Sequence, residues 1–119
     1  MEHKIAVIIF SGSGNHADMG KIANAMQIIR EFAEAGDKPK LLFDGAGVTW
    51  PLKLALEEHP LHRSFEKVLP YIEGVCKFCA NAFKVATEVE KTGVKLLEDY
   101  KGHPSVRSLM EEGYQIITL

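Results

Sequence analysis

Residues Ile5 to Phe10 form an unbroken apolar run, and the chain turns sharply after it at Ser11-Gly12-Ser13-Gly14. A short run of this kind, rich in valine and isoleucine, is typical of a parallel strand that is covered by other elements on both faces. The run therefore predicts a buried strand at the centre of a sheet.

A helix is predicted next, because apolar residues recur at helical spacing between Met19 and Ala33. Asp18 is available as its N-cap and Gly36 as its C-terminal stop. Residues Lys40 to Asp44 predict a second strand, which ends at a glycine turn. The first part of the chain is therefore interpreted as a βαβ unit, whose crossover is right-handed by default.

The rest of the chain continues this alternation of helix and strand. We expect a short helix over Trp50 to Glu58 and a second helix from Pro60, which Pro70 ends or kinks. A strand should follow before Cys79, and then a helix from about Ala80 to Lys91 with Phe83 and Ala86 facing inward. A short helix from Pro104 and a closing strand over Tyr114 to Leu119 complete the chain. Residues 93–100 fit either a short strand or a loop. The pattern predicts a three-layer, flavodoxin-like α/β sandwich with a mostly parallel sheet of four or five strands.

The size and charge of the chain limit its organisation and its partners. Its 119 residues are enough for one compact domain and too few for two ordinary ones, so we expect a single domain over residues 1–119. The formal net charge of −2 argues against a nucleic-acid partner. No apolar run approaches the roughly 18 residues of a membrane span, and the first residues lack a signal-peptide pattern. We therefore expect a cytoplasmic protein without a membrane partner.

Two cysteines, Cys76 and Cys79, lie where the predicted strand runs into a helix. A disulfide between them would close too short a loop to staple a secreted fold, and in a reducing compartment such a pair is more often catalytic or metal-binding. We place Cys79 at the joint, where free N–H groups and the helix dipole favour a thiolate, so it is a candidate reactive sulfur. Cys76, within the strand, is either a core residue or a second thiol. The alternative is that both are ordinary buried cysteines.

Three loops are expected to converge beyond the carboxyl ends of the strands, where open α/β sheets hold their functional crevice. They are residues 11–18, residues 44–50 and the segment around Cys79. Candidate ligand-binding residues on the first two are Gly12, Ser13, Gly14, Asn15, Gly45, Gly47 and Trp50. The first loop formally fits a dinucleotide fingerprint, and Asp44 lies where a ribose-binding acid would be. The chain hardly has room for a second mononucleotide half, so an anion site or a plain tight turn is the better interpretation, and Trp50 either lines the crevice or packs beside it.

The histidines give no metal motif in the sequence. They are scattered, at His3, His16, His59, His62 and His103, and none has a ligand spacing with the cysteine pair. The pair alone supplies half of a tetrahedral zinc site, which we expect only an oligomer to complete. We therefore predict neither a metal nor a cofactor. His16 either approaches Cys79 or is a solvated loop histidine.

Three segments of the chain resemble the DsrE-like family, which includes the DsrE/DsrF and TusD-type sulfur-relay proteins. Gly74-Val75-Cys76-Lys77-Phe78-Cys79-Ala80-Asn81-Ala82-Phe83 resembles the strand-to-helix turn of that family. Residues 109–117, LMEEGYQII, resemble its closing helix and strand, and residues 44–48, DGAGV, resemble its second glycine turn. With the βαβ start, the resemblance covers nearly the whole chain.

The resemblance implies a parallel-sheet fold and a sulfur-relay function. In relay members the cysteine matching Cys79 accepts sulfane sulfur as a persulfide and passes it on, which implies sulfur-donor and sulfur-acceptor proteins as partners. It also implies homo-oligomers, commonly trimers or hexamers. The alternatives from the residues themselves are an oligomeric module that binds a small ligand or nucleotide without catalysis, and a CxxC redox protein. We expect the second cysteine, not the first, at the helix N-terminus, which argues against the redox alternative.

Overall fold

A computed structural model describes residues 1–119 and contains one five-stranded sheet in which every strand pair is parallel. The strands are β1 (Lys4–Ile9), β2 (Lys38–Phe43), β3 (Ile72–Cys76), β4 (Leu96–Leu97) and β5 (Gln115–Thr118), in the order β4-β3-β2-β1-β5. The predicted flavodoxin-like α/β sandwich is confirmed. β1 is internal, paired with β2 and β5, although β2 holds the middle position.

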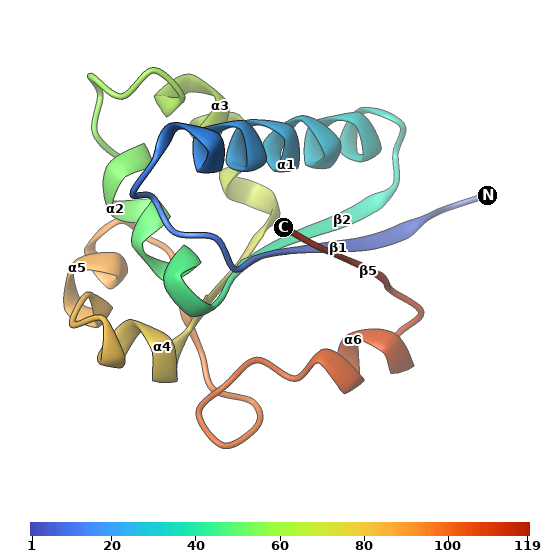
Figure 1. The fold of residues 1–119 in the computed structure, drawn as a ribbon. Coiled ribbons are helices and arrows are strands. Elements are labelled where there is room, and N and C mark those ends of the chain that lie inside the picture. The colour runs from blue at the N-terminus through green and yellow to red at the C-terminus, as the bar shows by residue number, and fades with distance from the viewer.

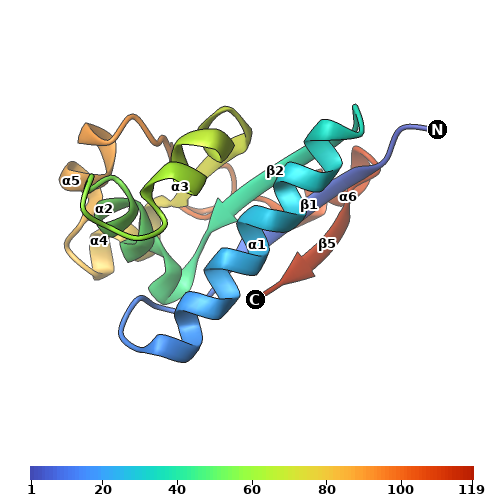
Figure 2. The same cartoon turned by 90° about the horizontal axis from the view of Figure 1, so that it is seen from above.

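Helices lie on both faces of the sheet (Figure 1). The helices are α1 (His16–Glu34), α2 (Trp50–Leu54), α3 (His62–Val68), α4 (Lys77–Ala82), α5 (Ala86–Lys91) and α6 (Val106–Glu111), with short 3₁₀ turns η1 (Gly45–Thr49) and η2 (Leu69–Tyr71). α1 and α3 cover one face and α6 lies on the other, while α2, α4 and α5 gather at one end of the molecule (Figure 2). No helix combines the length and the apolar character that crossing a membrane requires.

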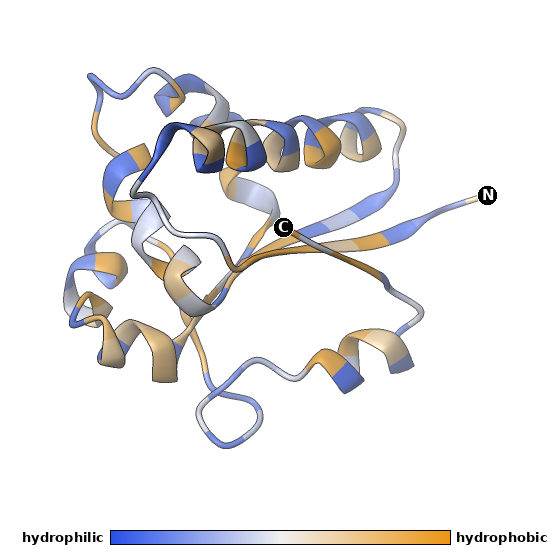
Figure 3. Ribbon diagram, in the orientation of Figure 1, coloured by the Kyte–Doolittle hydropathy of each residue, from blue (hydrophilic) through white to orange (hydrophobic).

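The alternation of side chains along β1 divides the core between the two faces of the sheet. Val7 and Ile9 belong to the larger cluster, with the buried side of α1, whereas Ala6 and Ile8 belong to a smaller cluster with Leu109 of α6. The C-terminal parts of β1 and β2 are correspondingly hydrophobic, whereas the first residues of both strands are hydrophilic (Figure 3). Burial on both faces explains why this strand has no polar alternation in the sequence.

Helix α1 begins earlier than expected, because Asn15 rather than Asp18 is its N-cap. The Asn15 side chain accepts the backbone N–H of Asp18 at 3.0 Å. The predicted stop is confirmed: Gly36, with φ +85°, follows the C-cap residue Ala35. The helix expected over Trp50 to Glu58 ends at Leu54, and the ambiguous segment 93–100 contains β4.

The joint between β3 and the next helix differs from the prediction by a few residues. β3 ends at Cys76 and α4 begins at Lys77, so Cys76 is the N-cap and Cys79 lies in the first turn. The single helix expected to reach Lys91 is divided into α4 and α5, and Lys84, with φ 60°, lies between them. The break leaves Phe83 48% exposed, so the prediction that it faces inward was wrong.

Gly47 lies where η1 passes against the end of β1, and it provides a test of this packing. A Cβ atom at Gly47 would overlap the Ile9 carbonyl, whereas one at Gly14 would meet nothing within 4 Å. We expect Gly47→Ala to lower the free energy of unfolding by about 1–3 kcal/mol, the usual cost of overpacking. Urea denaturation of Gly47→Ala and of the control Gly14→Ala measures the difference. Equal unfolding midpoints for the two variants would contradict this packing.

Candidate functional site

Four side chains that can react or bind a metal ion lie close together at the carboxyl end of the sheet. Asp44 follows β2, Cys76 ends β3, Cys79 lies in α4, and His103 lies between β4 and α6. One donor atom from each residue lies within 4.8 Å of all the others. We call Asp44, Cys76, Cys79 and His103 the thiol cluster. It lies at the edge where α/β sheets hold ligands and reacting groups.

Cys76 is the buried member of the thiol cluster. It has 0% exposure, and its Sγ atom accepts the backbone N–H of Cys79 at 3.5 Å and lies 3.3 Å from His103 Nδ1. Burial raises the pKa of the Cys76 thiol to about 12. The hydrogen bond from the Cys79 N–H lowers this pKa, and the negative charge of Asp44 raises it. Cys76 is therefore a protonated, enclosed thiol at neutral pH.

Cys79 is the more accessible sulfur, because its side chain is only partly buried. Its thiol donates a hydrogen bond to Asp44 Oδ1 at 3.4 Å. The same oxygen accepts the backbone N–H of Gly45 at 2.7 Å, which fixes the carboxylate at the end of β2. The Asp44 carboxylate is thus placed to receive the Cys79 thiol proton.

A tight turn brings His103 to the cysteines. Tyr100 and His103 exchange two backbone hydrogen bonds of 2.8 Å, and the residues between them, Lys101 and Gly102, have φ values of 50° and 86°. Two successive positive φ angles are the mark of a type I′ turn. The Gly102 carbonyl accepts the Phe78 N–H at 2.9 Å, which attaches the turn to α4. The Phe78 ring then lies 4.7 Å from the His103 ring, between centroids.

The expectation that only an oligomer could complete a ligand set around the cysteine pair was wrong, because His103 of the same chain joins the pair. His103 is 27 residues from Cys76 in sequence, so no local spacing indicates their contact. The available signal was the Lys101-Gly102 pair, which suits a two-residue turn but does not specify where the turn packs. His16, the histidine considered in the sequence, is exposed at the start of α1 and is not part of the thiol cluster.

The argument against a redox CxxC pair was also wrong in its geometry. The first cysteine, Cys76, is the N-cap of α4, and the second lies inside the helix. The end of this strand was predicted too late in the chain, because Lys77 and Phe78 were counted as part of the strand. Both sulfurs are free thiols, with the buried one at the helix terminus.

The glycine-rich loop after β1 packs against the loop after β2. Ser13 Oγ and Thr49 Oγ1 share a hydrogen bond of 3.0 Å, and Lys53 Nζ donates to the Ser13 carbonyl at 3.1 Å. A Cβ atom on Gly12 would lie 3.1 Å from the Ala46 Cβ. These polar groups therefore bind each other across the two loops.

The remaining candidates on these loops also have structural partners. Trp50 is 1% exposed and its indole N–H donates to the Ser11 carbonyl at 3.0 Å, so it packs in the core beside the crevice. Asn15 is used as the cap of α1. Gly45 has φ +52° and turns the chain directly after Asp44, while Gly47 contacts β1. Asp44, considered as a ribose-binding acid, contacts Cys79 instead.

The fold and the site define a small α/β protein with a parallel, flavodoxin-like sheet and a cluster of thiols, carboxylate and imidazole at its carboxyl edge. No protein-family model matches the chain. The chain is 37% identical over 117 residues to the uncharacterized protein MJ0733 of Methanocaldococcus jannaschii, a match that spans 98% of this chain and 95% of that protein. It therefore belongs to the same family as MJ0733.

A solved structure supports the fold. The conserved protein of unknown function BT1422 from Bacteroides thetaiotaomicron superposes with a TM-score of 0.60, covering 96% of this chain and 94% of the other. The two sequences are 17% identical, so this likeness extends to the fold alone.

Proposed function

We propose that the protein is a sulfur carrier that accepts sulfane sulfur on Cys79 as a persulfide and passes it to a partner protein. The observation that supports this most is the pairing of the partly buried Cys79 thiol with the Asp44 carboxylate at 3.4 Å. A thiolate is the nucleophile in sulfur transfer, and a neighbouring base promotes its formation. The resemblance of residues 74–83 to the DsrE-like turn supports the same chemistry.

The proposed transfer conserves atoms and charge. Asp44 takes the proton from Cys79, and the thiolate attacks the outer sulfur of a donor persulfide. The donor's sulfur–sulfur bond breaks as the new one forms, and the proton held by Asp44 goes to the departing donor thiolate. The products are a Cys79 persulfide and a donor thiol. The reverse attack, by an acceptor's thiolate on the outer sulfur of Cys79, unloads the protein.

Cys76 offers a second route for releasing the sulfur. Cys76 would lose its proton and attack the inner sulfur of the Cys79 persulfide, whose sulfur–sulfur bond breaks as the Cys76–Cys79 disulfide forms. The outer sulfur would leave as sulfide and take up the proton, which gives hydrogen sulfide. The two sulfurs lie within 4.8 Å of each other and would have to move closer for this reaction. Because Cys76 is completely buried, an outside acceptor reaches only Cys79, and transfer to a partner does not require Cys76.

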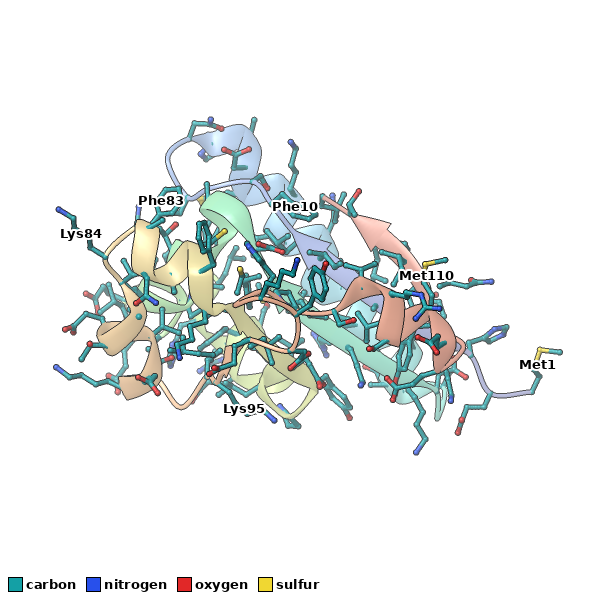
Figure 4. The ribbon with its side chains drawn as sticks, turned by 90° about the horizontal axis from the view of Figure 1, so that it is seen from below. Met1, Phe10, Phe83, Lys84, Lys95 and Met110 are labelled. Carbon is teal, nitrogen blue, oxygen red and sulfur yellow. The ribbon has the colours of Figure 1, made fainter.

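We also propose that the chain works as a homo-oligomer, a trimer or a hexamer. Large apolar side chains are exposed, among them Phe10, Phe78, Phe83 and Met110. Figure 4 labels three of them, Phe10, Phe83 and Met110, in the view from below. A second copy of the chain could cover these side chains, and the resemblance to the DsrE-like family implies such an assembly. Size-exclusion chromatography with light scattering tests the assembly, and a monomer at micromolar concentration would exclude it.

Intact mass spectrometry tests the proposed function. Reduced, metal-free protein is incubated with polysulfide and weighed, together with Cys79→Ser and Cys76→Ser. We expect wild type and Cys76→Ser to gain about 32 Da per sulfur atom, and Cys79→Ser to gain nothing. Wild type that forms a Cys76–Cys79 disulfide loses hydrogen and keeps no sulfur, so the decisive sample is Cys76→Ser, which cannot form this disulfide and should retain the sulfur if the protein is a carrier. Loading of Cys79→Ser to the wild-type level would refute the carrier function.

A further inference from the structure

We infer that Asp44, Cys76, Cys79 and His103 form a binding site for a single zinc ion. The donor set combines two cysteine sulfurs, an imidazole nitrogen and a carboxylate oxygen, all of which are established zinc ligands. Two thiols exclude the hard cations, which prefer oxygen donors. The sequence suggested half of such a site, and the fold supplies the other half from Asp44 and His103.

The distances between donor atoms fit a tetrahedral ion. With ordinary zinc bond lengths, neighbouring donors around the ion would be roughly 3.4 to 3.8 Å apart. Cys76 Sγ lies 3.3 Å from His103 Nδ1, and Cys79 Sγ lies 3.4 Å from Asp44 Oδ1. All four atoms are within 4.8 Å of one another, so a small contraction completes the coordination sphere. Binding would replace the two thiol protons by the metal ion.

The backbone around the thiol cluster already holds the ligands in place. Asp44 is fixed by the Gly45 N–H at 2.7 Å, and the Cys79 N–H points at Cys76 Sγ at 3.5 Å. His103 is held by its type I′ turn, which the Phe78 N–H attaches to α4. Hydrogen bonds that orient metal ligands are a regular part of metal sites, because they reduce the rearrangement needed on binding. The ligands come from separate segments, so the ion would also join the ends of β2 and β3 to the 100–103 turn.

Zinc binding does not depend on the proposed sulfur transfer. Both would use the Cys79 sulfur, so a zinc-bound chain and a persulfide-bearing chain would be alternative states of one site. A metal titration of the reduced chain needs no sulfur donor. Failure of metal binding would therefore leave the sulfur-carrier proposal standing, and failure of sulfur loading would leave the zinc site standing.

The experiment is a titration of reduced, metal-free protein with Zn²⁺ against a chromophoric chelator, and a parallel titration with Co²⁺ followed by absorbance. We expect one ion per chain, and for Co²⁺ an intense sulfur-to-metal charge-transfer band with the visible bands of a tetrahedral site. His103→Gln should weaken zinc binding by at least about 10–100-fold, the loss typical of removing even an outer partner of a metal site. Cys79→Ser should reduce the charge-transfer intensity by about half, because one of two thiolates is lost.

Two controls separate the site from adventitious binding. His16→Gln removes an exposed histidine of α1, and Asp37→Asn removes a carboxylate at the opposite end of β2, so neither should change zinc affinity. The inference depends on His103→Gln and Cys79→Ser, because the buried Cys76 also caps α4 and its replacement risks unfolding. Absence of the charge-transfer band, or zinc binding by His103→Gln as tight as wild type, would overturn it.

Discussion

Replacing Asp44 by asparagine should slow the loading of sulfur onto Cys79 by about 10²–10⁴-fold, the usual contribution of a positioned general base. Asparagine keeps the size of the side chain and can still accept the Gly45 N–H, but it cannot take the Cys79 thiol proton. The initial rate of mass gain with polysulfide, measured with a chelator present to exclude metals, gives the effect.

Asp37→Asn is the matched control for Asp44→Asn. The two aspartates flank β2, one before Lys38 and the other after Phe43, so they lie at opposite ends of the same strand. Asp37 accepts the His3 N–H at 2.8 Å and is not part of the thiol cluster. Its replacement should leave the loading rate unchanged. A wild-type rate in Asp44→Asn would remove Asp44 from the proposed mechanism.

A large loss of stability is expected from Gly74→Ala, in β3, where an unusual backbone angle adds to the steric overlap. Gly74 has φ +153°, and a Cβ atom there would lie 2.5 Å from the Lys95 carbonyl and 2.8 Å from Leu97 Cγ. The substitution combines backbone strain with overpacking, so we expect it to lower the free energy of unfolding by about 2–6 kcal/mol. That is a large part of the stability of a typical domain, about 5–15 kcal/mol. Chemical denaturation measures the loss.

Gly20→Ala in α1 provides the contrast with Gly74→Ala. A Cβ atom at Gly20 would meet nothing within 4 Å, and alanine is favoured over glycine inside a helix by about 0.5–1 kcal/mol. Gly20→Ala should therefore be as stable as wild type or slightly more stable. If both variants unfold at the wild-type midpoint, β4 does not pack on Gly74 as described.

The fold could be predicted because its strongest signals are local. The unbroken apolar run of β1, the helical stripe of α1 and the stop at Gly36 each depend on residues close in sequence. The ends of the helices and strands were predicted less well, because each end depends on a single contact or backbone angle. The cap of α1 depends on which of two nearby polar side chains accepts an N–H, and the break at Lys84 depends on one backbone angle that the sequence does not indicate.

The site could be predicted only in part. Cys79 was identified because it follows a strand at the functional edge of the sheet, whereas Asp44, which ends the neighbouring strand, was considered only as a ribose-binding acid. His103 was missed because its position depends on a turn that packs on α4 through one Phe78–Gly102 hydrogen bond. The ligand-binding potential of Gly12 and Ser13 was considered from their sequence pattern, whereas the structure shows their loop packed against η1 and α2.

Locating the sulfur after loading tests the sulfur-carrier proposal most directly. Lys77 lies between the two cysteines, so trypsin separates Cys76, in the peptide 68–77, from Cys79, in the peptide 78–84. Protein loaded with polysulfide is alkylated while folded, digested without reductant and analysed by tandem mass spectrometry. We predict the additional sulfur, about 32 Da, on the peptide that contains Cys79 and none on the peptide that contains Cys76. Sulfur on the Cys76 peptide, or on neither peptide in protein that carries no Cys76–Cys79 disulfide, would contradict the proposal.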